Sequence, residues 1–160
     1  MDWDWRARPT YESDRLGVDG RLFPVVLCNL KQPRLLEDHE VDLMLDWADS
    51  HLQGALPFVA LVLQTRGSGV IAARHRQTLA EWLATRREVL ARSDSSLVVV
   101  VPESIHRAVL RVVYRFRKPP IRTIMTPGSA SAAEAVRAEL RRMRQPISPE
   151  IEGFLPTLTG

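Results

Sequence analysis

The chain has 160 residues, of which 45% are apolar and 26% charged, and its formal net charge is +3. This length fits one domain, whose core needs no disulfide or metal, and the composition excludes a disordered chain. The single cysteine, Cys28, excludes an internal disulfide and suits a reducing compartment. The polar N-terminus does not resemble a secretion signal, and no apolar run approaches ~18 residues. We therefore expect a cytoplasmic protein with no membrane span.

The first segment of the chain, residues 1–20, is expected to form an arm and a possible edge strand. An Asp19-Gly20 turn would join that strand to the next one as a hairpin. Trp3 and Trp5 stand in this polar arm, and tryptophan is costly to leave in water. We expect these two side chains to fold back on the domain, or to contact a partner or a second copy.

Four segments have the pattern of buried strands, because they are short, apolar and rich in β-branched residues. They are residues 22–30, 57–65, 96–103 and 121–127. Continuous apolar runs of this kind favour strands that are covered on both faces, as in a parallel sheet.

Helical spacing of apolar residues marks the segments between the strands. The predicted helices span residues 35–52, 70–92, 104–118 and 131–144. Ser104 is a candidate N-cap for the third helix, and Ser131 and Glu134 have the spacing of a capping box for the fourth. Pro119 and Pro120 end the third helix.

The predicted order is therefore β-β-α-β-α-β-α-β-α. Alternation of strands and helices predicts a single α/β domain over residues 21–145, with a central, mostly parallel sheet of four to five strands and about four helices. The proline-containing residues 146–160 are expected to form a C-terminal tail.

This order of elements resembles the STAS fold, named for sulfate transporters and anti-sigma-factor antagonists, and it is most similar to the stand-alone bacterial sporulation stage II AA type. The resemblance covers roughly residues 20–143. Its carriers are hydrophobic patterns: "RQTLAEWL" from Arg76, "SLVVVVPES" from Ser96, "HRAVLRVVYRFRKPP" from His106 and "SAAEAVRAELRRM" from Ser131. The resemblance implies a non-catalytic regulatory module that binds another protein.

In the antagonists of this family, a serine between the third strand and the next helix is phosphorylated, and the added charge breaks the complex. Ser68 stands at the matching position here, within "RGSG". The aspartate of the family motif is replaced by the Arg66-Gly67 step. The resemblance thus implies a partner-binding or phosphorylation site formed by Arg66, Gly67, Ser68 and Gly69.

The residues of this turn leave other interpretations open. Glycine supplies the positive φ that a tight strand-to-helix turn requires, so Gly67 and Gly69 fit a purely structural turn. An unphosphorylated contact loop is a further alternative. A helix N-terminus also attracts phosphate, but the segment lacks the lysine and the spacing of a nucleotide-binding loop.

Basic residues are concentrated late in the chain. Residues 104–145 hold ten Lys and Arg against two acids, Glu134 and Glu139. Helical spacing gives one basic face on each of two helices, which would merge if both helices covered the same side of the sheet. The set is Arg107, Arg111, Arg115, Lys118, Arg137, Arg141 and Arg144. An anionic membrane surface or an acidic protein groove fits it, as does a solvated face; nucleic acid is less favoured, because exposed aromatics for stacking are few.

Catalytic chemistry has weak support in the sequence. Cys28 and Arg34 have the Cys-x5-Arg spacing of cysteine phosphatases, but the intervening residues contain no glycine, and Pro33 removes an N–H donor. A buried strand cysteine is the alternative that we favour. None of the four histidines has metal-ligand spacing with another histidine or cysteine.

We therefore expect a protein-interaction module of STAS type, with no cofactor, no metal and no catalytic residue, that docks through residues 66–70 and the neighbouring helix faces. Its partner would be another protein, and a homo-oligomer is a further option. The alternative is a lipid- or small-molecule-binding domain similar to the CRAL-TRIO group, which would need a cavity between sheet and helices. A cysteine phosphatase and a nucleic-acid-binding domain are less favoured alternatives.

Overall fold

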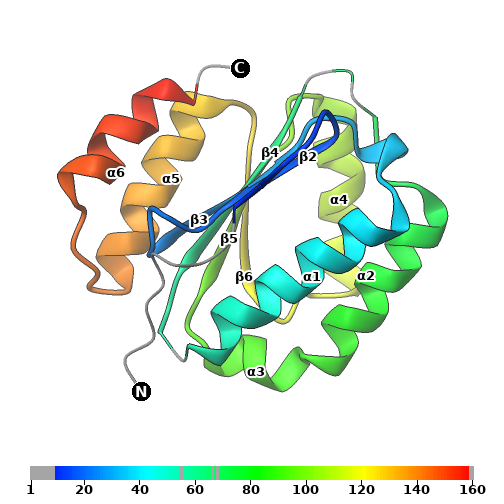
Figure 1. Cartoon of the computed structure of the whole chain (residues 1–160), viewed down its shortest axis with the longest axis horizontal. Helices are drawn as coiled ribbons and strands as arrows, with labels where there is room; N and C mark the ends of the chain where they lie inside the picture. The colour runs from blue at the N-terminus through cyan, green and yellow to red at the C-terminus, as the bar shows by residue number, and fades with distance from the viewer. Residues whose placement is uncertain (1–9, 55, 66, 68, 159–160) are drawn as a thin grey trace.

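The computed structural model describes residues 10–54, 56–65, 67 and 69–158. The arm residues Trp3 and Trp5 lie outside them. One six-stranded sheet runs through the middle of the described chain, and its strands lie side by side in sequence order (Figure 1). They are β1 (Tyr11–Glu12), β2 (Leu16–Asp19), β3 (Val25–Leu30), β4 (Val59–Gln64), β5 (Ser96–Val100) and β6 (Arg122–Thr126).

The sheet is antiparallel at its start and parallel elsewhere. β1 pairs with β2, and β2 with β3, in antiparallel ladders, so the predicted edge strand is present as a hairpin against β3. From β3 to β6 each strand pairs with its successor in parallel register, for example Val25 with Val59 and Ser96 with Arg122. The predicted α/β domain with a mostly parallel sheet is confirmed.

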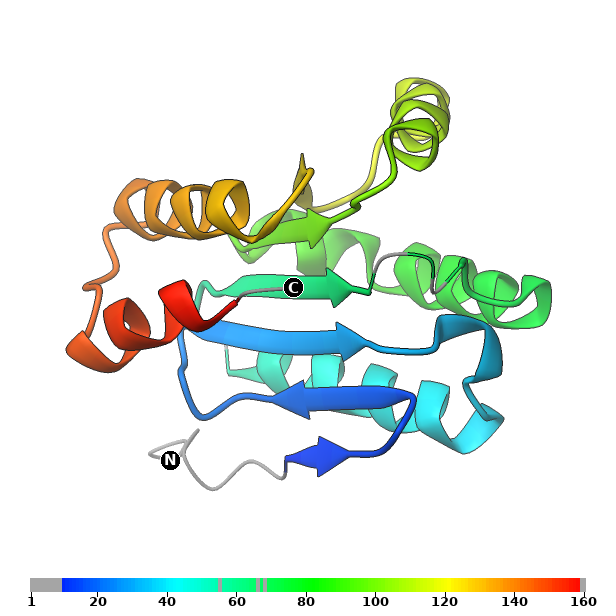
Figure 2. The same cartoon turned by 90° about the horizontal axis from the view of Figure 1, so that it is seen from above.

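Helices cover both faces of the sheet (Figures 1 and 2). Those on one face connect successive parallel strands, and those on the other follow β6. The first group is α1 (Asp38–Gln53), α2 (Ala73–Thr85), α3 (Arg87–Arg92) and α4 (Ser104–Phe116); the second is α5 (Ser129–Arg142) and α6 (Pro149–Phe154). Two 3-10 turns complete the described chain, η2 (Pro33–Leu35) before α1 and η3 (Leu155–Thr157) after α6.

Two hydrophobic cores result from the alternation of side chains along the strands. In β3, Val25 packs toward α5 and α6, whereas the next residue, Val26, packs toward α1. Leu61 and Val98 continue the first core, and both are fully buried. A strand covered on both faces needs apolar residues at every position, which is why these segments are continuous apolar runs.

The predicted helix over residues 70–92 is divided into α2 and α3. Arg86, at the junction, has a non-helical backbone, and its guanidinium forms a salt bridge with Asp49 of α1 at 2.6 Å. The indole N–H of Trp82 donates to the same carboxylate at 3.1 Å, and Arg86 lies over the Trp82 ring. This contact between α1 and α2 explains the break, and it is long-range in sequence.

Both predicted N-caps are wrong by one or more residues. Glu103, not Ser104, is the N-cap of α4. α5 begins at Ser129 with Gly128 as its N-cap, so Ser131 and Glu134 do not form a capping box. A capping box does occur at the start of α1, between Glu37 and Glu40.

The C-terminal segment differs from the predicted tail. Ser148 caps α6 by accepting a hydrogen bond from the Ile151 N–H. Ile151, Leu155 and Leu158 are buried in the core that α5 shares with the sheet. Residues 149–158 therefore form part of the domain, because their apolar side chains cover sheet surface beside α5.

A buried carboxylate, Glu40, joins the β1–β2 hairpin to α1. It accepts hydrogen bonds from Ser13 at 2.7 Å, from Arg15 at 2.8 Å and from Tyr11 at 3.2 Å. The Glu37 N–H donates to it as well. Burial by itself would raise the pKa of Glu40, but these donors lower that pKa to about 2.

Glu139 has the equivalent role on the other face. It is buried on α5 and accepts hydrogen bonds from Arg122 of β6, from Arg142 and from Ser96 of β5. Burial raises its pKa, and these three donors together bring it below the ordinary value. One carboxylate therefore ties α5 to the neighbouring strands β5 and β6.

We expect Glu40→Gln to lower the free energy of unfolding at neutral pH by about 2–3 kcal/mol, because it leaves Arg15 and its hydrogen-bonding neighbours without their buried anion. The measurement is chemical denaturation followed by circular dichroism. The matched control is Glu88→Gln on α3, where an exposed pair with Arg92 contributes little.

The pH dependence has a definite sign. The folded pKa of Glu40 lies below its ordinary value of 4.5, so its stabilisation is fully present above pH 4.5 and is lost as the pH falls toward 2. Glu40→Gln should therefore show a shallower loss of stability with acid than the wild type. Parallel acid profiles for the two proteins would contradict this assignment.

Candidate functional site

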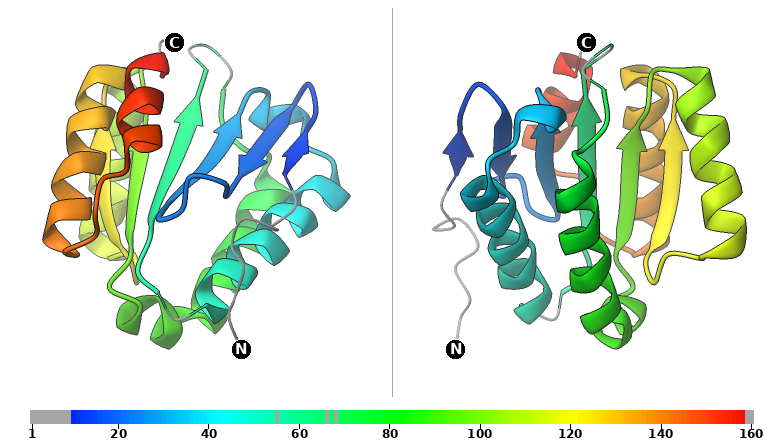
Figure 3. Two further views of the ribbon diagram at one scale, coloured as in Figure 1. Left: turned by 60° about the vertical axis from the view of Figure 1, so that its left-hand side comes forward. Right: turned by 90° about the vertical axis from the view of Figure 1, so that its right-hand side faces the viewer.

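The carboxyl ends of the parallel strands lie at one edge of the sheet, and the loops that follow them meet there (Figure 3). The predicted docking loop, residues 66–70, follows β4 at this edge. Arg66 and Ser68 lie outside the described residues, so the structure does not test the predicted phosphorylation site. Gly67, Gly69 and Val70 are described.

Two hydrogen bonds and one close approach involve the described glycines of this loop. The Gly67 N–H donates to the Glu103 carboxylate at 2.7 Å. The Gln64 side-chain amide donates to the Gly69 carbonyl, and the Arg34 side chain occupies the space that a Cβ at Gly69 would need. Gly67 and Gly69 have φ of 72° and 82°, which glycine adopts without strain. Gly67 is thus hydrogen-bonded to the residue that precedes α4, and Gly69 to the last residue of β4.

Glu103 is the residue that the sequence prediction missed. The segment around Ser68 contains no acid, yet the structure brings this carboxylate to the loop from 36 positions away. Its only sequence signal is its position directly after the valine-rich strand, at the carboxyl edge. His106 also lies near Glu103, with its Nδ1 3.6 Å from the carboxylate.

Two exposed aliphatic residues adjoin, in the chain, Arg34 and Gly69. Leu35, next to Arg34 in η2, is 61% exposed, and Val70 is 42% exposed. We refer to Arg34, Leu35, Gly67, Gly69 and Val70 as the loop surface. It combines exposed apolar groups with the hydrogen-bonded glycines of the loop.

The predicted basic residues form separate patches. α4 and α5 lie on opposite faces of the sheet, so their basic faces do not merge (Figure 1). On α5, Arg137 forms salt bridges with Glu134 at 2.7 Å and Glu152 at 3.0 Å. On α4, Arg107 donates to the Val101 carbonyl at 2.6 Å. The remaining members are exposed: Arg111, Arg115, Lys118, Arg141 and Arg144.

Cys28 and Arg34 do not form a phosphatase site. Cys28 is buried in the core under α1, where its Sγ lies 3.6 Å from the Met44 Sδ. Burial raises the pKa of its thiol to about 12, so it is not a thiolate at neutral pH. The Arg34 side chain is directed at Gly69 instead.

The histidines have structural partners. His75 is buried on α2, and its Nε2 lies 2.9 Å from Asp38 at the start of α1. His51 is buried on α1, with its Nδ1 2.9 Å from the Trp47 carbonyl. Among the described residues, no three His, Cys, Asp or Glu side chains gather in a way that could hold a metal ion.

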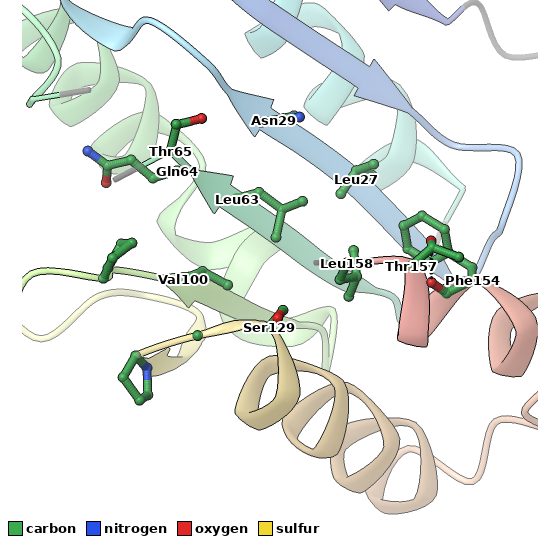
Figure 4. A pocket seen from close by; sticks show the side chains of 13 residues that line it. Leu27, Asn29, Leu63, Gln64, Thr65, Val100, Ser129, Phe154, Thr157 and Leu158 are labelled. Atoms are coloured by element: carbon green, nitrogen blue, oxygen red, sulfur yellow. Dashed lines mark hydrogen bonds between the residues drawn. The ribbon is translucent and has the colours of Figure 1, made fainter. Parts of the chain in front are cut away.

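An open depression of about 750 Å³ lies on the α5 and α6 side of the sheet, near the carboxyl ends of β3 and β4 (Figure 4). Its walls mix apolar and uncharged polar side chains from the sheet, from the start of α5 and from the C-terminal segment. They include Leu27, Asn29, Leu63, Gln64, Ser129, Phe154, Thr157 and Leu158. No charged residue lines it within the described chain.

No family model, no curated protein and no solved structure matches this chain. In the part of the chain that the structure describes, none of the helices combines the length and the hydropathy needed to cross a membrane.

The Cys28 thiol should react slowly with a disulfide reagent such as DTNB in the native protein, and rapidly after denaturation, because burial both covers it and disfavours the thiolate. The absorbance of the released thiophenolate measures both rates. Fast native reaction, or an aryl-phosphate hydrolysis that is lost in Cys28→Ser, would contradict a structural role.

Proposed function

We propose that this chain is a protein-interaction module of STAS type whose partner docks at the loop surface. The proposal draws on the resemblance of residues 20–143 to the anti-sigma-factor antagonist branch, in which the same loop contacts the partner. The observation that carries it is the exposure of Leu35 and Val70, together with the hydrogen bonds of Gly67 to Glu103 and of Gly69 to Gln64.

The physical argument is preorganisation. A loop that is already ordered loses little conformational entropy on binding, so its exposed apolar groups contribute more to affinity. Gly67 and Gly69, the described glycines of this loop, have positive φ, and each takes part in a hydrogen bond with a side chain, Glu103 or Gln64. A phosphorylation switch at Ser68 stays a prediction of the resemblance.

The test is affinity capture of the full chain from the cells that produce it, comparing wild type with Leu35→Asp combined with Val70→Asp. We expect one protein at stoichiometric amounts with the wild type and at least about a tenfold loss with the double variant, because buried charge disrupts an apolar contact. Val89→Asp, an equally exposed valine on α3, is the control. Undiminished capture by the double variant would contradict docking at this surface.

A second candidate function, binding of a small amphipathic molecule, is favoured by the depression beside β3 and β4. Its apolar side chains and its uncharged polar groups suit a neutral or weakly polar ligand. This is the place between sheet and helices where the lipid-binding alternative requires a cavity.

Native mass spectrometry of the purified full chain tests this candidate. A ligand would add a discrete mass, and Leu63→Trp, which fills the depression, should remove that mass while the protein stays folded. Ala130→Trp, at an exposed position of α5 outside the depression, serves as the control. A wild-type mass equal to the bare chain after gentle purification would count against it.

A further inference from the structure

α4 shows its apolar side to the solvent. Four aliphatic residues recur at i, i+4, i+7 and i+8 along it, and their exposed fractions are 69%, 56%, 58% and 47% in chain order. We call them the α4 stripe: Ile105, Val109, Val112 and Val113. Such a row on one helix is unusual, because exposed apolar residues normally occur singly.

The helix contacts the domain through its other side. The half-buried residues of α4 are His106, Arg107, Leu110 and Tyr114. At 100° per residue, their mean direction is about 130° from that of the α4 stripe. Figure 2 shows α4 at a corner of the molecule, set apart from α1 and α2. The stripe therefore points away from the sheet along a convex ridge.

Positive charge accompanies the α4 stripe. Residues 104–118 contain five basic residues and no acid. On the helix, Arg111 and Arg115 are one turn apart on the polar side, and both are exposed. At 100° per residue they point about 145° and 105° away from the mean direction of the stripe. Arg117 and Lys118 add two exposed cations directly after the helix. Long arginine side chains beside an apolar row can keep their charge in water while their stems lie on an apolar surface.

We propose that α4 lies in the headgroup region of an anionic lipid bilayer, with the α4 stripe toward the acyl chains and its cations at the lipid phosphates. A strongly amphipathic helix with a basic polar face and low mean hydropathy is the type that binds such an interface. Charge complementarity selects an anionic surface over a neutral one. A convex ridge suits a bilayer, which adapts to one helix, whereas a protein would need a matched groove.

A second copy of the chain fits the stripe less well. If two α4 helices paired antiparallel through the stripe across a two-fold axis, Arg111 and Arg115 of both copies would lie on the same side of the pair. Residues 104–118 contain no acid to offset this charge. The loop surface lies on residues that the stripe does not include. Bilayer attachment through α4 and the protein docking proposed above thus rest on different residues, and either can fail without the other.

The test is co-sedimentation of the full chain with vesicles, either of phosphatidylcholine alone or of phosphatidylcholine and phosphatidylglycerol in equal parts. We expect binding to the anionic vesicles at least about tenfold stronger than to the neutral ones, and weakening with added salt. Val109→Asp with Val112→Asp should abolish it, and Arg111→Gln with Arg115→Gln should weaken it by about fivefold per charge removed.

Matched controls lie elsewhere on the surface: Val89→Asp on α3, and Arg87→Gln with Arg141→Gln. These should bind as the wild type does, and circular dichroism checks that each variant is folded. A Val112→Cys chain carrying an environment-sensitive dye gives a second reading, because buried Cys28 does not compete for the label. The dye should shift to the blue with anionic vesicles, and a dye at Val89→Cys should not.

Equal binding to both vesicle types, no binding, or unchanged binding of the aspartate variant would overturn the proposal. A second result would also overturn the proposal. If light scattering gave twice the mass of the chain for the wild type and the single mass for the aspartate variant, and neither bound vesicles, the stripe would be a contact between two copies.

Discussion

The sequential order of the parallel strands is the constraint on which the rest of this structure depends. Each step from β3 to β6 moves one place in the same direction, and the connecting helices all lie on one face. Crossovers between parallel strands are right-handed, so the helices that join strands added in one direction all lie on the same face of the sheet. The other face is then free for α5 and for the C-terminal segment, which cover it together.

This order also decides which loops lie together at the carboxyl ends of the strands. Open α/β sheets bind ligands where the strand order reverses, and the parallel strands here contain no such reversal. The carboxyl edge instead carries loops that contact one another, with Glu103 and Arg34 both fastened to the glycines after β4. The last connecting helix, α4, leads to the edge strand β6. The apolar side of α4 is exposed to solvent.

Two buried carboxylates join helices to strands of the sheet. Glu40 joins the antiparallel hairpin to α1, and Glu139 joins α5 to β5 and β6. In each case arginine and serine donors hold the pKa of the carboxyl below its ordinary value, against the effect of burial. Neither group was distinguishable in the sequence from the many solvated acids, because burial depends on contacts far apart in the chain.

By itself the sequence determined the fold class and most of the elements, because periodicity is a local property. The valine-rich run 96–103 contains β5, and Gly67 and Gly69 have the positive φ expected of glycine. Only the tertiary structure decided which face each helix covers. That choice separated the basic residues of α4 from those of α5, buried Ile151 and Leu155 where a tail was expected, and placed Glu103 at the loop. It also turned the α4 stripe outward, since an amphipathic pattern predicts that a helix has an apolar face but not what that face meets.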